Sequence, residues 1–407
     1  MRIYLGAFGD PGHAFPMIAL GGMLVERGHS VAMDTWQKWR EPVEAAGMTF
    51  TQAPEYQVFP TREKPLKPYA AAVRAAEEIR PFVHDFAPDV AVADILTPGP
   101  ALAAELEGVP LATLVPHVFP WVPPGHPIYS IGARIPRTPL GAALWTRANR
   151  RFVVPSLEEG RAQYNETRRR LGLDPLPDVH TTLSRELTMV GTLPHLEYPR
   201  RWERWVRVVG PLQWEPPGER VEPPPGRGPV VLIAPSTSQD PEHVLLRAAL
   251  EGLADAPVRV TATYNGREPA APIPVPGNAV LVPWLSYSKT MPLCDVVVLH
   301  GGHGTLVRAL AAGCSVVVCP VAGDMNENAS RVEWAGVGKR IPLRWLGARS
   351  LRLAVQGALR PPVREKAAAV SRWAATHDGR VTAALELEAW AALRRSSRRR
   401  VGSSPRS

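Results

Sequence analysis

A glycine-rich segment in the second half of the chain has the residue types of a phosphate-binding turn. The run DVVVLHGGHGT, residues 295–305, combines an apolar strand pattern, a terminal histidine and three glycines ahead of a helical pattern. Glycines let the backbone approach a ligand, and the next helix presents unpaired N–H groups to an anion. His300 is placed to donate a hydrogen bond to a phosphate oxygen. A plain turn with a structural histidine is the alternative, and the spacing matches neither GxGxxG nor a P-loop.

A second histidine, in the first half of the chain, has the position of a general base. His13 follows the first strand pattern in the run FGDPGH and opens the first helical pattern. Imidazole titrates near neutral pH, so a histidine at the carboxyl end of a strand can take a proton from a hydroxyl group. A role in packing or at the helix start is the alternative.

Two sets of alternating strands and helices must position these histidines. Short apolar runs alternate with helical patterns from the N-terminus to about residue 116, and the alternation restarts at residue 230. This order predicts two parallel, doubly wound α/β sheets. Ligands of such sheets bind at the carboxyl ends of the strands, where both histidines are expected.

A proline-rich stretch separates the two sets. Seven prolines lie within Gly210–Pro229, and proline continues neither a helix nor a central strand. We therefore predict an N-terminal domain over residues 1–209, a linker over 210–228, a C-terminal domain over 229–380, a helix over 381–393 and a disordered basic tail over 394–407.

Composition and charge narrow the classes of partner. Six arginines in the last fourteen residues supply most of the net charge of +9, leaving +3 (9 minus 6) for the rest of the chain. A short basic, serine-rich terminus is typical of a solvated tail, so we predict no nucleic-acid or membrane partner. With no signal peptide, no run near 18 apolar residues and three sparse cysteines in apolar stretches, we expect a cytoplasmic protein with reduced thiols.

Three runs in the second half together resemble a family signature. They are Val282-Pro-Trp284, HGGHGT and AAGCSVVVCPVAGDMNENA, with weaker matches at GDPGHAFP and VVGPL. Their order and spacing resemble the donor site of inverting nucleotide-sugar glycosyltransferases (glycosyltransferase family one), especially bacterial natural-product enzymes. The resemblance implies the α/β GT-B fold, in which two Rossmann-like doubly wound domains face each other across a cleft. The N-terminal domain would bind the acceptor and the C-terminal domain the donor.

The resemblance also implies a reaction and its partners. A sugar would move from a nucleoside diphosphate to a hydroxyl group of a small natural-product acceptor, with inversion and without a metal ion or cofactor. The partners would be a nucleotide-sugar donor and a small-molecule acceptor, and a homodimer stays open.

Matched residue by residue, the resemblance implies a donor site in the C-terminal domain. Trp284 would stack on the nucleotide base, with a core position as its alternative, and Asp324 would bind sugar hydroxyl groups. The diphosphate would be held by His300, Gly302, Gly304, Thr305, Ser236 and Thr237.

In the first domain, the resemblance makes His13 the base and Asp94 the acid that orients it. An aspartate bonded to one ring nitrogen fixes the tautomer and stabilises the imidazolium ion; Asp10 is a rival partner because it is so close in sequence. Aromatic residues of the irregular loops suit a flat apolar acceptor, with ordinary packing as the alternative for each. They are Tyr56, Phe59, His117, Phe119, Trp121 and Tyr129.

Two departures from the family pattern bear on the donor. Arg308 stands where the family commonly has a glutamate that bonds both ribose hydroxyls, and Met325 stands where a glutamine follows the aspartate. A nucleotide without the 2′-hydroxyl and a sugar without one hydroxyl would tolerate these losses. They favour a TDP-linked deoxysugar over UDP-glucose, unless Arg308 simply contacts a phosphate or solvent.

Other functions stay open at this point. A lipid-linked cell-wall glycosyltransferase should carry an apolar, basic patch on the first domain, and the sequence shows none that is convincing. A nucleotide-sugar epimerase would need acids in the cleft. A binding module acting through the arginine-rich tail is the alternative from another class, and a catalytically inactive sensor is disfavoured because His13 and Asp94 are both present.

Overall fold

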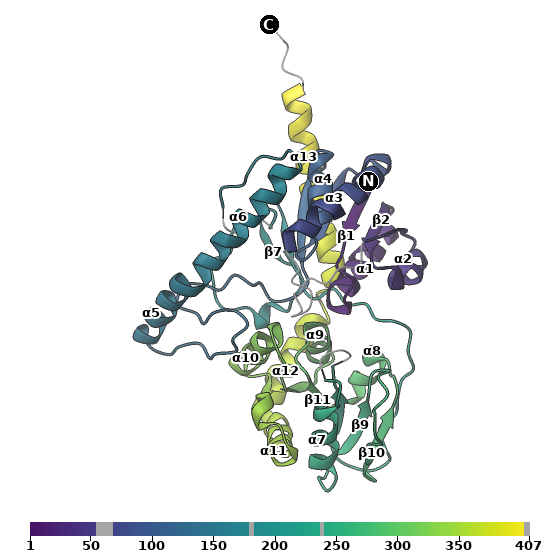
Figure 1. Ribbon diagram of the computed structural model, residues 1–407. Helices are drawn as coiled ribbons and strands as arrows, with labels where there is room; N and C mark the ends of the chain where they lie inside the picture. The colour runs from purple at the N-terminus through teal and green to yellow at the C-terminus, as the bar shows by residue number, and fades with distance from the viewer. Residues whose placement is uncertain (54–67, 179–182, 237–239, 403–407) are drawn as a thin grey trace.

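The computed structural model describes residues 1–53, 68–178, 183–236 and 240–402 (Figure 1). Two parallel sheets form separate α/β domains, which confirms the predicted fold class. The first sheet has the strand order β3-β2-β1-β4-β5-β6-β7, and the second has the order β10-β9-β8-β11-β12-β13. Each order reverses once, between β1 and β4 and between β8 and β11. Ligands of doubly wound sheets bind at such reversal points.

The N-terminal domain contains most elements of the first half. Its strands are β1 (Arg2–Gly6), β2 (Ser30–Thr35), β3 (Thr49–Gln52), β4 (Val90–Asp94), β5 (Leu111–Val115), β6 (Thr188–Val190) and β7 (Val206–Val208). Its helical segments are α1 (Pro11–Glu26), η1 (Gln37–Trp39), α2 (Arg40–Ala45), α3 (Pro68–Phe86), α4 (Pro98–Leu106), α5 (Pro139–Ala148), η2 (Asn149–Val153), α6 (Val154–Arg170) and η3 (Pro194–Leu196).

The C-terminal domain follows a segment between β7 and β8 that forms neither helix nor strand. Its strands are β8 (Val230–Ala234), β9 (Arg259–Thr263), β10 (Ala279–Val282), β11 (Val296–Leu299), β12 (Ser315–Val318) and β13 (Gly338–Arg340). Its helical segments are α7 (Val244–Leu253), α8 (Tyr287–Thr290), η4 (Met291–Leu293), α9 (His303–Ala311), α10 (Asp324–Ala335), η5 (Leu343–Trp345), α11 (Ala348–Ala358) and α12 (Pro361–Ala374).

The central strands of the second sheet are almost entirely apolar because helices cover both faces of that sheet. Every residue of β8, β11 and β12 is buried, and their sequences are VVLIA, VVVL and SVVV. Continuous runs of this kind, rather than alternating ones, are typical of parallel strands. The rigid sheets therefore fix the loops at their carboxyl ends, which hold the predicted site residues.

The last helix, α13 (Gly379–Gly402), returns to the N-terminal domain. Ala383, Ala384 and Leu387 are buried in the core that contains α1 and β1. The prediction of a disordered tail from residue 394 is wrong as far as Gly402, because arginine is a good helix former and the helix simply continues. Arg395 there lies 3.3 Å from the carboxylate of Asp89. The end of the predicted tail, residues 403–407, lies outside the described residues.

A buried ionic network joins the two domains. The Arg331 guanidinium of α10 lies 2.8 Å from a carboxylate oxygen of Glu197, which follows η3, and 2.9 Å from Glu327. Their side chains are 1%, 6% and 4% exposed respectively. Glu197 also accepts a hydrogen bond from the backbone N–H of Phe119. The first turns of α10 are therefore tied to a loop of the N-terminal domain.

The structure also shows the state of the cysteines and whether it contains membrane-spanning helices or metal-binding clusters. All three cysteines are free; Cys314 and Cys319 are buried and Cys294 is half-buried. Among the helices in the described ranges, none is long and apolar enough to cross a membrane. The same residues contain no group of three potential metal-binding side chains.

Candidate active site

His13 and Asp94 meet where the order of the first sheet reverses. β1 and β4 are neighbours, so α1 after β1 and the last residue of β4 reach the same place. The His13 Nδ1 atom lies 2.8 Å from Asp94 Oδ2, and the Asp94 side chain is fully buried. The other oxygen of Asp94 accepts the backbone N–H of Leu96. Nδ1 therefore carries the proton toward Asp94, and Nε2 of a neutral His13 is left as the acceptor.

The surroundings of His13 make it a stronger base than an ordinary histidine. Burial disfavours the imidazolium ion, but the charge of Asp94 and its hydrogen bond outweigh burial, and Asp10 and Asp324 add to them. The pKa of His13 is consequently raised above its usual 6.5. Asp324 belongs to the other domain, so His13 lies close enough to that domain for the charge of Asp324 to act on it.

Two more histidines lie close to this pair. The His117 ring is 6.0 Å from the His13 ring, centre to centre, and its Nδ1 donates to the carbonyl of Val118. Burial, followed by the charge of His13, lowers the pKa of His117. Burial, followed by the charge of His117, lowers the pKa of His303 to about 3. Among these three, the pKa of His13 alone is raised, which is the direction that a general base requires. His303 lies within HGGHGT, but the sequence analysis gave it no role.

On the donor side, glycines shape the turn between β11 and α9. A Cβ atom on Gly302 would lie 2.4 Å from Nε2 of His300, so only glycine lets that ring pack over the turn. Gly301 has a φ of +98°, which favours glycine. At Gly304 a Cβ atom would meet nothing within 4 Å. The first turn of α9, which also contains Thr305, is therefore open to an anion.

The other residues predicted for the donor site follow strands of the same sheet or begin α10. Asp324 is the first residue of α10, and its charge acts on both His13 and His300. Burial, partly opposed by the Ala234 carbonyl and Asp324, lowers the pKa of His300. Ser236 is buried just after β8, and Trp284 is 40% exposed just after β10. The exposed indole is available for stacking rather than placed in the core.

Arg308 is largely buried and has partners within the protein. Its side chain is 12% exposed, and one guanidinium nitrogen lies 3.0 Å from a Glu215 carboxylate oxygen. Another nitrogen donates to the backbone carbonyl of Trp214. Glu215 also accepts hydrogen bonds from Ser286 and Ser288. A carboxylate from the linker therefore stands beside α9, where the sequence had shown only an arginine.

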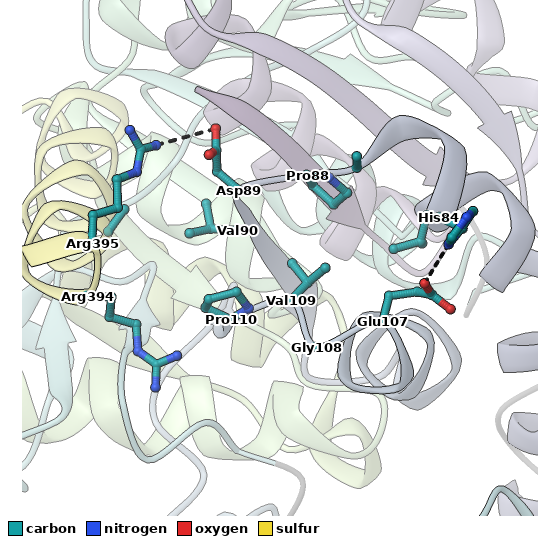
Figure 2. Close-up of a pocket in the computed structure, with 13 residues that line it drawn as sticks. His84, Pro88, Asp89, Val90, Glu107, Gly108, Val109, Pro110, Arg394 and Arg395 are labelled. Atoms are coloured by element: carbon teal, nitrogen blue, oxygen red, sulfur yellow. Dashed lines mark hydrogen bonds and ion pairs between the residues drawn. The ribbon is translucent and has the colours of Figure 1, made fainter. Parts of the chain in front are cut away.

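A pocket elsewhere in the N-terminal domain is separate from this site. Figure 2 shows it at the amino ends of β4 and β5, near Val90 and Pro110, with a volume of about 480 Å³. His84 pairs there with Glu107 at 2.9 Å. The catalytic pair lies at the carboxyl ends of the strands, so this pocket is at the opposite edge of the sheet.

Comparisons with known proteins point to one class of enzyme. Residues 247–379 match the family model "Erythromycin biosynthesis protein CIII-like, C-terminal domain". The O-mycaminosyltylonolide 6-deoxyallosyltransferase of Streptomyces fradiae is 28% identical, and the match covers 97% of this chain and 98% of that one. The chain is a glycosyltransferase of the GT-B fold, and it is similar to the natural-product enzymes of glycosyltransferase family one. The epimerase and the tail-based binding module are thereby set aside.

Solved structures of glycosyltransferases share the fold of this enzyme. The kitacinnamycin glycosyltransferase has a TM-score of 0.76 at 22% identity, with 96% of this chain and 98% of that one covered. VinC, solved in complex with dTDP, has a TM-score of 0.71 at 18% identity, with 96% and 99% covered. The similarity extends over both domains.

The residues predicted for the acceptor pocket of the glycosyltransferase fall into three groups. His117 lies beside the catalytic pair. Phe119 is fully buried and packs with Trp121 and Trp202, which agrees with the alternative of ordinary packing. Trp121 is held in the same aromatic cluster. Tyr129 is near Asp324 and Glu327 of the donor domain, whose charges raise its pKa further after burial. Three predicted site residues, Tyr56, Phe59 and Thr237, lie outside the described residues.

We expect Asp94→Asn to slow the enzyme without weakening nucleotide binding. The loss of orientation should cost at least about tenfold in turnover, up to the roughly 10²–10⁴-fold contribution of a general base itself. Without the charge of Asp94, burial would dominate and lower the pKa of His13. The acidic limb of the pH–rate profile should therefore move to lower pH, and Asp10→Asn is the matched control with a smaller shift. If TDP affinity, measured by calorimetry, collapses in Asp94→Asn, the residue acts in donor binding instead.

Proposed function

We propose that this enzyme moves a deoxysugar from TDP to a hydroxyl group of a small natural-product aglycone, with inversion and without a metal ion or cofactor. One observation carries the proposal: the His13–Asp94 pair lies close enough to Asp324, the first residue of α10 in the other domain, for the charge of Asp324 to act on His13. A base, an anion-binding turn and a sugar-binding acid then act on one space. The name of the Streptomyces fradiae relative, a deoxyallosyltransferase, supports the class of sugar.

The proposed reaction is a single displacement. Nε2 of His13 takes the proton of the acceptor hydroxyl while the oxygen attacks the anomeric carbon. Asp94 stabilises the imidazolium ion that forms. The nucleoside diphosphate leaves from the opposite face, where the N–H groups and dipole of α9, together with His300, would meet its negative charge. Attack opposite the leaving group inverts the anomeric centre, so no carboxylate nucleophile is required.

We expect TDP to raise the melting temperature more than UDP or GDP at equal concentration, because a ligand that binds the native state stabilises it. The complex of VinC with dTDP supports this expectation. Equal rises in melting temperature with TDP and UDP, or a larger rise with UDP, would contradict the preference for TDP that we infer from Arg308 and Met325.

The contact between Arg308 and Glu215 decides how the nucleotide preference is tested further. Arg308→Glu alone would place a second carboxylate near Glu215 in a largely buried position and remove the cation that Glu215 contacts. The exchange of Arg308→Glu with Glu215→Arg preserves the pair and places a carboxylate on α9. If a carboxylate at position 308 binds the ribose hydroxyls, the exchange should make the rise in melting temperature with UDP more similar to the rise with TDP. An unchanged difference in a protein of normal stability would show that position 308 does not set nucleotide choice.

A further inference from the structure

Helix α5 and the π-helical segment η2 form the outer end of an arm that projects from the N-terminal domain (Figure 1). Both segments lie within the described residues, and neither contains a buried residue. Large apolar side chains there face solvent: Leu140 is 71% exposed, Leu144 61% and Phe152 62%. A helix of this length has little stability without a packed face. A group of exposed apolar side chains of this kind indicates a surface that binds a partner.

The backbone aligns these apolar side chains. Leu140 and Leu144 are one turn apart on α5, and Phe152 is eight residues beyond Leu144. In a helix of 3.6 residues per turn, side chains four residues apart differ in direction by about 40° around the helix axis. The π turn of η2 has more residues per turn, so it reduces this difference between Leu144 and Phe152. The three side chains consequently form one stripe, and Arg147 and Arg151 come at positions that flank it.

The charge of this region has one sign. Residues 131–157 contain five arginines and no aspartate or glutamate. Arg134 pairs with Glu333 of α10 at the base of the arm. Within the described residues, the other four form no ion pair: Arg137, Arg147, Arg150 and Arg151. The tip of the arm is therefore both apolar and strongly basic, which the sequence analysis did not find.

We propose that the tip of the arm, residues 137–154, binds the surface of an anionic lipid membrane, with α5 lying along the interface. Leu140, Leu144 and Phe152 would enter the boundary between headgroups and acyl chains. The arginines would contact lipid phosphates. A basic polar face beside an apolar one is the pattern of interfacial helices.

The same observations disfavour the other occupants. A two-fold contact between copies of the chain through this face would bring two acid-free, basic tips together. Like charges so placed repel. A second protein would need a groove that is both acidic and apolar, whereas an anionic membrane offers both properties on a flat surface to a projecting helix.

Vesicle co-sedimentation of the full chain tests the proposal. Vesicles of phosphatidylcholine are compared with vesicles in which about a quarter of the lipid is phosphatidylglycerol. We expect binding to the anionic vesicles only. Since each arginine near the surface contributes about fivefold to the partition coefficient, Arg147→Gln with Arg151→Gln should lower it about 25-fold. Leu140→Ser with Leu144→Ser and Phe152→Ser should lower it at least about tenfold.

A matched control separates the arm from the rest of the surface. Arg349→Gln with Leu353→Ser changes an arginine and an exposed leucine on α11, and should leave binding unchanged. All variants keep the C-terminal arginines, so a loss in the arm variants belongs to the arm. Melting temperature and turnover with a water-soluble acceptor should stay normal in each. The proposal is overturned by equal binding to neutral vesicles, by no binding at all, by unaltered binding of the arm variants, or by a dimer or an acidic protein bound through the tip in place of lipid.

Discussion

Turnover with an alcohol acceptor should fall by about 10²–10⁴-fold when His13 is replaced by alanine, the range that general-base catalysis contributes. A nucleoside diphosphate is already a good leaving group, so the difficult step is activation of a neutral hydroxyl. His13 is the histidine near the domain boundary whose pKa is raised, and Asp94 holds its ring. Steady-state kinetics measure the loss, and calorimetry with TDP should show near-normal affinity.

His117→Ala is the informative control for that result. His117 lies beside His13, but burial lowers its pKa and its Nδ1 is committed to a backbone carbonyl. Its removal should change acceptor affinity more than turnover. If His117→Ala instead shows the larger loss in turnover, the base has been assigned to the wrong histidine.

Replacing Arg331 by methionine should lower the free energy of unfolding by about 3–5 kcal/mol, because the change leaves buried carboxylates without a partner. Glu197 and Glu327 would both lose the guanidinium that lies within 3 Å of them. Burial already raises the pKa of Glu197 despite Arg331. Urea unfolding followed by fluorescence measures the effect.

Two further variants test whether the lower free energy of unfolding comes from the unpaired buried carboxylates. Arg134→Met breaks an ion pair with Glu333 on the same helix, but the Arg134 side chain is 73% exposed, so less than about 1 kcal/mol is expected. Arg331→Met combined with Glu197→Gln and Glu327→Gln removes the stranded charges and should recover much of the stability. Similar losses for Arg331→Met and Arg134→Met would show that the buried network does not hold the domains together.

Strand order explains why the catalytic pair could be predicted and much of its surroundings could not. His13 and Asp94 both follow strands of a doubly wound sheet, and such strands place their carboxyl ends together. No comparable rule predicts the positions of the aromatic side chains in the loops. Phe119 and Trp121 follow β5 without periodicity. Only packing with Trp202 and Trp205, over 80 residues away, buries Phe119 fully and Trp121 in part.

Long-range ion pairs were equally hidden from the sequence. Glu215 lies in a proline-rich linker that predicts no position for its side chain, yet it sits beside Arg308 of α9. The contact of Arg331 with Glu197 spans 134 residues. The arm was missed for a different reason: no pattern in residues 139–153 shows that they lie uncovered, and only the structure shows that Leu140 and Leu144 are exposed.

The central claim is that His13 activates the acceptor for attack on a nucleotide sugar. The most direct test compares an aliphatic alcohol with an acidic phenol as acceptors of TDP-deoxysugar, in the wild-type enzyme and in His13→Ala. A phenol ionises more readily and depends less on a base, so the loss of turnover should be much larger for the alcohol. Near-normal turnover with the alcohol in a folded His13→Ala protein, or an equal loss with both acceptors, would contradict the claim and direct the search to Asp10 or His117.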